Sequence, residues 1–551
     1  ARPQGPAGAE AEGEAEAVTE ASQAAARAPS APDFRLLNGA PVQADFGGLL
    51  HVGDARCRAA EALGLPPARV RLVGPAGELA DDCAGQLEGV GSVQVYILPD
   101  PLEKELAAAA EAEFFVDLLE RRELDLNGQQ LAALPEKFGQ LEALEELTLC
   151  ENQLTALPES FGGLAALRSL HLLHNHLATV PKSFGGLAAL DYLSLAYNEV
   201  TTLPESFGLL RSLRTLHIYH NLLQALPENF GMLPALVHLR LEFNRLVVLP
   251  ETFSELVSLQ ELRLGENALE RLPESFGRLQ KLRMLYLSSN QLATLPESFG
   301  QLSALQKLSL GDNQLQRLPE SFGDLSSLQE LSLSQNFLTA LPESFGQLAT
   351  LQLLELYQNK LTALPASFGR LAALRILYLG ANELAALPED FGQLVALRNL
   401  SFNANHLTAL PETFGRLVNL KSLSSSANKL RALPESFVEL RALQHLRLEG
   451  NHLAALPARF GQLAALRTLH LGGNQLASLP ESFGQLAALQ TLSLHNNNLT
   501  SLPRSFFRRL GALQELDLRR NRLFLDSRLA FRRRMTSRLL ALRNWCWCCS
   551  C

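Results

Sequence analysis

The sequence predicts an α/β solenoid, in which short parallel strands form the concave face of a curved sheet and short helical or irregular segments form the convex face. Three observations predict it. The letters of one unit, from Leu144 to Leu164, return every 23 residues. Leucines alternate with polar residues, as in Leu147-Thr148-Leu149, so one face of a short strand is buried. Asparagine recurs in the same register from Asn152 to Asn497, which makes 16 units.

The remaining positions of a unit predict how the chain returns. A buried amide at Asn152 can satisfy backbone groups that the bend leaves unpaired. Pro158 sets the start of the return segment, and Gly162 allows a tight turn beside Phe161. With one earlier unit and a last one shifted by a single inserted residue, we expect about 18 repeats, each of which needs neighbours to cover its leucines.

These letters resemble the leucine-rich repeat, L-x-x-L-x-L-x-x-N-x-L, across residues 123–524. The segment 157–164, LPESFGGL, is similar to the 23-residue class of intracellular Ras-group and Ras-suppressor scaffolds. That class usually has an aliphatic residue where this chain repeats phenylalanine from Phe138 to Phe506. The resemblance implies a non-catalytic scaffold whose expected partners include a small GTPase or a phosphatase.

The N-terminal part changes character twice. Residues 1–32 have almost nothing to bury and predict a disordered tail. Within 33–99 we expect a hairpin turn at Asn38-Gly39, a helix over 54–63 and strands over 69–73 and 93–98.

Residues 64–73, GLPPARVRLV, resemble the ubiquitin fold. This resemblance implies a small β-grasp domain over 33–99, with Val73 in its recognition patch and a ubiquitin-pathway component as a further candidate partner. A β-grasp cap without such a role is an equally open alternative.

Helical segments are expected to close both ends of the solenoid. Asp100-Pro101-Leu102-Glu103 starts a cap helix over 100–122, with Leu102, Leu106, Phe115 and Leu119 on one side. Residues 525–551 predict a basic cap helix and a cysteine-rich tail, because nine arginines fall between Arg519 and Arg543.

The tail has other interpretations. Acylated cysteines and a basic helix would anchor the protein peripherally at the inner membrane surface, and a segment foreign to the natural protein is a third alternative. Adjacent cysteines do not readily form a tetrahedral metal cage. The lipidation candidates are Cys546, Cys548, Cys549 and Cys551.

Composition restricts the function. A net charge of −9 argues against a nucleic-acid partner, and seven irregularly spaced cysteines favour a reducing, cytoplasmic location. The sequence contains no recognisable catalytic motif, so we expect neither an enzyme nor a cofactor. His171, His174 and His176 are interpreted as residues of a binding surface and not as metal ligands, because 171 points to the concave face while the other two flank the turn.

The predicted partner site lies on the concave face, where the positions beside the strand leucines vary between units. Tyr and Arg offer large contact areas there, whereas the units around Ser401, Asn403, Ser422, Ser424 and Ser426 offer small side chains. Six tyrosines are assigned to this face: Tyr192, Tyr197, Tyr219, Tyr286, Tyr357 and Tyr378. The partner-binding residues are predicted to be His171, Leu173, Tyr192, His217, Tyr219, His238, Arg240, Glu242 and Arg263.

The site and composition favour an adaptor that binds a protein on its concave surface, with affinity that changes between pH 6 and 8 through the histidines. Two alternatives stay open. One is a ubiquitin-pathway substrate receptor that uses the 33–99 domain. The other is a fragment of a larger signalling enzyme.

Overall fold

The structure is a computed structural model of the 551-residue chain, and it describes residues 33–36, 52–63, 70–74, 77–78, 92–97, 101–112 and 115–523. The chain divides into two compact units, residues 1–105 and 106–551.

The N-terminal unit contains a four-stranded sheet with the order β1-β4-β2-β3. Its elements are β1 (Asp33–Leu36), α1 (Val52–Leu63), β2 (Val70–Gly74), β3 (Gly77–Glu78) and β4 (Ser92–Ile97). Strand β4 runs parallel to β1 and antiparallel to β2, and α1 contacts β2. The helix and two strands lie close to where the sequence predicts them, whereas the Asn38-Gly39 turn lies outside the described residues.

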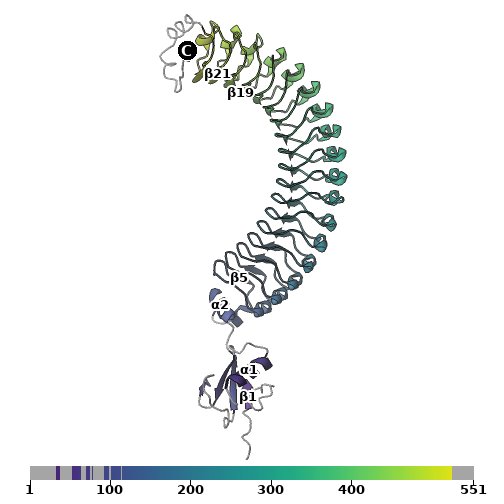
Figure 1. Cartoon of the computed structure of the whole chain (residues 1–551), viewed down its shortest axis with the longest axis vertical. Helices are drawn as coiled ribbons and strands as arrows, with labels where there is room; N and C mark the ends of the chain where they lie inside the picture. Colours follow the sequence, from purple (N-terminus) through teal and green to yellow (C-terminus); the bar gives the residue numbers. More distant parts are fainter. Residues whose placement is uncertain are drawn as a thin grey trace, which may run out of the picture. The chain divides into compact units, whose positions relative to one another are not determined.

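The second unit is a curved solenoid whose 18 three-residue strands form one parallel sheet, and Figure 1 shows β5 and β21 near opposite ends of the arc. This confirms the predicted fold class and the repeat number. In every strand except the last the central residue is buried, as Leu216 is between Thr215 and His217, whereas Leu516 of the last strand is half-buried. The strands are β5 (Glu123–Asp125), β6 (Glu146–Thr148), β7 (Ser169–His171), β8 (Tyr192–Ser194), β9 (Thr215–His217), β10 (His238–Arg240), β11 (Glu261–Arg263), β12 (Met284–Tyr286), β13 (Lys307–Ser309), β14 (Glu330–Ser332), β15 (Leu353–Glu355), β16 (Ile376–Tyr378), β17 (Asn399–Ser401), β18 (Ser422–Ser424), β19 (His445–Arg447), β20 (Thr468–His470), β21 (Thr491–Ser493) and β22 (Glu515–Asp517).

On the convex side, each 23-residue repeat, called a unit from here on, forms one short 3-10 turn that follows the repeated proline. Its phenylalanine is fully buried, and from Phe138 to Phe437 and again from Phe460 to Phe506 each ring stacks on the phenylalanine of the next unit, with centroids 5.7–6.5 Å apart. The last unit instead has the short helix α3 (Phe506–Arg509), and β22 pairs with β21 at an offset of 24 residues, so the inserted residue is absorbed in this turn. The turns are η3 (Glu136–Gln140), η4 (Glu159–Gly163), η5 (Lys182–Gly186), η6 (Glu205–Leu209), η7 (Glu228–Met232), η8 (Glu251–Glu255), η9 (Phe276–Arg278), η10 (Glu297–Gln301), η11 (Glu320–Asp324), η12 (Glu343–Gln347), η13 (Ala366–Arg370), η14 (Glu389–Gln393), η15 (Glu412–Arg416), η16 (Glu435–Glu439), η17 (Phe460–Gln462) and η18 (Glu481–Gln485).

The asparagine column joins consecutive units through hydrogen bonds. The Asn152 Nδ2 donates to the carbonyls of Leu126 (2.8 Å) and Leu149 (3.1 Å), and its Oδ1 accepts the Leu131 N–H (2.9 Å). Asn152 is 5% exposed, so each of these groups would otherwise be buried without a partner. The predicted role of the buried amide is therefore confirmed.

The glycine of the convex turn is needed because the next unit approaches it closely. A Cβ at Gly300 would overlap the carbonyl of Ser321 in the following turn. Two of the 3-10 turns have a side chain at this position, Ser254 and Val438, and the turns that follow them, η9 and η17, contain three residues where most contain five. The glycine therefore permits the close packing of adjacent turns, which sequence inspection attributed to tight turning within one unit.

The N-terminal cap differs from its prediction. Helix α2 (Pro101–Ala109) ends well before Arg122, and a 3-10 turn, η2 (Phe115–Leu118), follows. The helix ends because Glu111 adopts a left-handed conformation (φ 53°) while the Ala112 N–H donates back to the Ala107 carbonyl (2.8 Å). Leu106 and Leu118 are buried in the same hydrophobic core as the repeats, so the sealing role is retained by a shorter helix and a turn. The predicted C-terminal cap, 525–551, lies outside the described residues.

Candidate concave binding surface

Side chains on the concave face fall into straight lanes, because the strands pair in parallel without a change of register. His217 lies between Ser194 of β8 and Arg240 of β10, and Thr215 lies between Tyr192 and His238. A third lane follows two residues later and contains Leu173, Tyr219 and Glu242. All nine predicted partner-binding residues occupy these lanes in five adjacent units, and all nine are half-buried.

The aromatic members of this set are in mutual contact. The ring of His171 stacks on Tyr192 with centroids 4.7 Å apart, and Tyr192 meets His217 edge-on at 5.5 Å. His217 lies 6.2 Å from Tyr219, and the Arg240 guanidinium lies 4.4 Å above the Tyr219 ring. Rings held against each other and under a cation lose little freedom on binding. We call these four rings the concave cluster.

The charged members neutralise one another. Arg240 donates to Glu242 Oε1 from Nε (3.1 Å) and NH2 (3.0 Å), and Arg263 donates to Glu261 (2.6 Å). His238 lies 3.4 Å from the same Glu261. Burial raises the pKa of Glu261, but the hydrogen bond and charge of Arg263 outweigh burial and leave the pKa lowered. The surface therefore has charged side chains without a large net charge.

The predicted change of affinity between pH 6 and 8 is wrong for His217. Burial and the nearby Arg240 charge lower the pKa of His217 to about 4, so this ring stays neutral throughout that range. Burial also lowers the pKa of His171.

A second aromatic row, which sequence inspection missed as a unit, lies in the turn after each strand. The rings of His174, Tyr197, His220 and Phe243 stack face to face, with successive centroids 4.4, 4.3 and 4.2 Å apart. We call this row the rim ladder. Tyr197, which was assigned to the concave strand positions, belongs to this turn, and its ring meets Tyr219 of the concave cluster edge-on at 5.5 Å.

The remaining histidine of the first group has a different partner. His176 Nδ1 lies 2.9 Å from Glu199, whereas His174 stacks on Tyr197. Within the residues that the structure describes, no group of three or more His, Cys, Asp or Glu side chains is placed to hold a metal ion.

The serine-rich units lie farther along the same lanes, and their serine hydroxyls donate hydrogen bonds to neighbouring side chains. Ser424 Oγ donates to Asn403 Oδ1 (2.8 Å), and Ser426 Oγ donates to Glu449 (2.6 Å). These short side chains present little area for a partner, and the predicted contrast in binding with the units around Tyr219 stays a prediction.

Near the C-terminal end of the concave face lies a hollow of about 400 Å³ that contains Ser493, His495 and Asp517. Ser493 Oγ lies 2.8 Å from His495 Nδ1, and Asp517 lies 3.7 Å from that same nitrogen. A catalytic serine and aspartate contact opposite ring nitrogens of their histidine. These three residues therefore do not form a catalytic triad.

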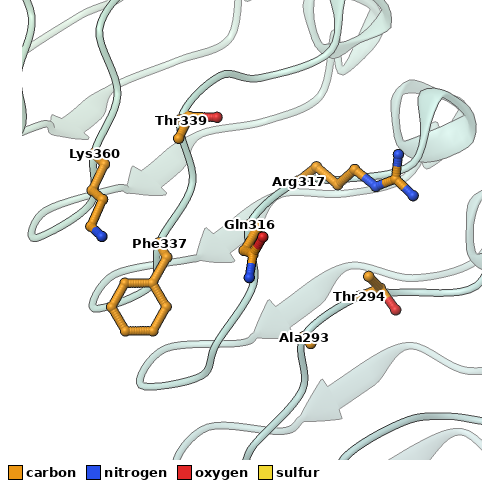
Figure 2. A pocket seen from close by; sticks show the side chains of 7 residues that line it. All are labelled: Ala293, Thr294, Gln316, Arg317, Phe337, Thr339 and Lys360. Atoms are coloured by element: carbon orange, nitrogen blue, oxygen red, sulfur yellow. The ribbon is translucent and has the colours of Figure 1, made fainter.

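A groove of about 890 Å³ lies outside the strand lanes, on the segments that follow the asparagines (Figure 2). Lys360 lies 4.9 Å above the Phe337 ring, and Figure 2 shows the Arg317 side chain extending away from that ring. Phe337 is 46% exposed and is not part of the rim ladder.

Comparison with known families and structures points to one kind of protein. A family model of a leucine-rich repeat region matches residues 181–269, 254–337 and 385–471, and a second leucine-rich repeat model matches 122–177, 330–384, 457–499 and 488–533. No curated protein matches the sequence.

Several solved structures are similar to the whole solenoid. A leucine-rich repeat protein of Leptospira interrogans is 33% identical with a TM-score of 0.57, over 78% of this chain and 96% of that one. A TDR receptor is 26% identical with a TM-score of 0.60, over 73% and 77%. The Arabidopsis receptor kinase HAESA, in complex with the peptide hormone IDA and the co-receptor SERK1, is 27% identical with a TM-score of 0.53, over 71% and 72%. Among the described residues, no helix is long and apolar enough to cross a membrane.

Proposed function

Because this chain belongs to the leucine-rich repeat family, we propose that it is a non-catalytic scaffold that binds a protein or peptide partner on its concave face. The fold leaves a rigid, open sheet whose outward side chains differ from unit to unit. The structural relative HAESA is a receptor kinase solved with a peptide hormone, which supports a peptide or protein as the class of ligand.

The concave cluster carries the proposal. His171, Tyr192, His217 and Tyr219 come from three adjacent units, and each ring touches the next. Preorganised Tyr and Arg side chains are typical binding hot spots because they bury a large area at small entropic cost. Nearly identical repeats offer a partner many equivalent registers, so only an irregular surface of this kind can define one.

The test needs a ligand, and a random peptide display library selected on the full-length chain supplies one. We expect Tyr219→Ala to weaken the selected peptides by about 1 kcal/mol or more, and Ser424→Ala to change binding little. Isothermal titration calorimetry measures both. Equal losses from the two substitutions would contradict the placement of the site.

Arg240 requires a second variant. Glu242 Oε2 is buried and has no hydrogen-bond partner in the described structure, so Arg240→Ala would leave that carboxylate without its cation. Arg240→Lys keeps the charge but not the two-armed hydrogen bond. We expect both variants to bind more weakly, and circular dichroism identifies any loss that comes from unfolding.

We also propose that residues 33–99 form a β-grasp domain that docks a second partner, with a ubiquitin-pathway component as the candidate. The strand order β1-β4-β2-β3, with the first and last strands parallel and adjacent, supports this proposal. Val73 lies in β2, and its side chain is outside the described part. Limited proteolysis of the full chain should release separate resistant fragments over 33–99 and 100–524, and early cleavage inside 33–99 would contradict a folded domain.

A further inference from the structure

We propose that the rim ladder binds a proline-rich segment of the partner in the left-handed polyproline II conformation. The inference rests on the proposed function, because the ladder is continuous with the concave cluster through the contact between Tyr197 and Tyr219. It adds the chemical class and the conformation of the ligand.

The ladder has ridges and a notch. Long six-membered rings alternate with short imidazoles in the order His174, Tyr197, His220, Phe243. Tyr197 is 39% and Phe243 46% exposed, whereas His220 between them is half-buried. Two aromatic ridges therefore flank a depression whose floor is the His220 ring. Aromatic-lined grooves are the surfaces on which polyproline segments dock.

The spacing of the ridges fits the repeat of this ligand. Successive ring centroids are 4.4, 4.3 and 4.2 Å apart, so the two ridges lie two units apart. Two such steps span roughly 8.5 Å, and one turn of polyproline II, three residues at about 3.1 Å each, spans roughly 9.3 Å. A β-strand repeats each face after roughly 6.7 Å and would lose register with the ridges.

The polar groups are complementary as well. A polyproline II segment has no internal hydrogen bonds, so its carbonyls accept from outside, and proline offers no N–H donor in return. The ladder presents the Tyr197 hydroxyl and the ring nitrogens of His174 and His220, and among the described residues no hydrogen bond engages these side-chain groups, whereas the backbone N–H groups of both histidines donate to the next unit. No carboxylate lies within the row, since Glu151 and Glu266 occupy this position only in the units beyond its ends.

The fold does not require these rings. All four residues adopt a left-handed backbone (φ 53–55°), which bulky side chains rarely do. Ala381, Ala404 and Ala427 form the same turn in other units with φ of 52–53°. Four consecutive aromatic residues at a position where alanine suffices support a role in binding. The comparison also means that an alanine at Tyr197 or Phe243 keeps the turn.

The experiment measures fluorescence anisotropy of a labelled twelve-residue peptide, (Pro-Pro-Ala)4, with the full-length protein. The all-D form of the peptide is the matched control, because it has identical composition and the opposite helical hand. We expect the L-peptide to bind and the D-peptide to bind at least about five-fold more weakly. Tyr197→Ala and Phe243→Ala should each weaken the L-peptide by about five-fold or more, as hot-spot residues do.

Phe337→Ala is the matched protein control, because Phe337 is as exposed as Phe243 but lies outside the ladder. It should change affinity less than about two-fold. Equal binding of both peptide hands, or equal losses from Phe243→Ala and Phe337→Ala, would overturn the inference.

The display library separates this inference from the proposed function. If selected peptides depend on Tyr219 but (Pro-Pro-Ala)4 does not bind, the concave site stands and the polyproline ligand is wrong. If no library peptide depends on Tyr219 or on the ladder, both proposals fail.

Discussion

Two glycines of the repeat unit allow a stringent test of how adjacent units pack. At Gly300, on the convex side, a Cβ would overlap the carbonyl of Ser321 in the next turn. At Gly311, beside a concave strand, the nearest atom to a new Cβ is the Ser334 carbonyl oxygen at 3.5 Å, an ordinary contact. Neither glycine has a positive φ, so the same substitution to alanine differs between the two sites only in what the methyl group meets.

The magnitude follows from two opposing terms. Both substitutions restrict the unfolded chain, which stabilises the fold by about 0.4–1 kcal/mol. Gly300→Ala must also displace the Ser321 turn, whose hydroxyl donates to the Glu297 carbonyl (2.6 Å), at a cost of about 2–3 kcal/mol for the overlap and the weakened bond. We therefore expect Gly300→Ala to destabilise by about 1–2 kcal/mol and Gly311→Ala to stabilise by about 0.5 kcal/mol.

Urea unfolding of the full chain, followed by circular dichroism at 222 nm, measures both values. Long repeat arrays can unfold in parts, so coincidence of the transition with that of intrinsic fluorescence is checked first. The reasoning is refuted if the two variants shift the unfolding midpoint equally, or if Gly300→Ala raises it.

Three further outcomes are expected. Ser425 is fully buried and its hydroxyl meets only Asn428 Nδ2, at 3.4 Å, so Ser425→Leu should stabilise by about 1–2 kcal/mol; a lower melting temperature would show that the large neighbour Phe402 already fills the space. Asn313→Ala removes three donated bonds and one accepted bond, and should cost about 3 kcal/mol or more in urea unfolding. The pKa of His217, about 4 when folded, lies below its ordinary 6.5, so the unfolded chain takes up the proton first and stability falls as the pH drops from 6.5 to 4. His217→Gln should reduce that loss. An equal fall of the urea midpoint from pH 7 to pH 4.5 in the natural protein and the variant would contradict it.

The solenoid could be predicted because every unit repeats the same residues at the positions that form the strand, the bend and the return segment. Leu147 and Leu149 set the strand, Asn152 the bend and Pro158 the return, and each role depends on neighbours only one unit away. The end of α2 could not be predicted in the same way. It depends on a left-handed Glu111, a conformation that glycine usually marks and that no letter near 111 indicates.

The concave lanes were equally accessible to sequence reasoning, because strand alternation fixes which side chains point outward. What alternation could not supply is how those side chains bond to each other. The pairing of Arg240 with Glu242, and the burial that lowers the pKa of His217, depend on side-chain positions that register alone leaves open. The pH dependence expected from the ordinary pKa of histidine is wrong for His217 for that reason.

The rim ladder shows what periodicity can reveal when every position of the unit is followed. Its four members lie 23 residues apart, so the signal was present in the sequence, but it falls at the turn residue and not at a strand residue. Turn residues are usually chosen for their backbone, and here most units have Ala, Ser, Gln, Asp or Gly at this position. An aromatic side chain at φ 53–55° adds nothing that the turn needs, and only its neighbour one unit away gives it a stacking partner. Rings that stack on one another in this way are stable at a strained backbone position without a ligand. The alternation of short imidazole rings with longer six-membered rings gives this stack no packing advantage. The alternation of His220 with Tyr197 and Phe243 is therefore the feature that distinguishes a binding groove from a stack that stabilises only itself, and exchanging His220 for Tyr would fill the notch while keeping the stack.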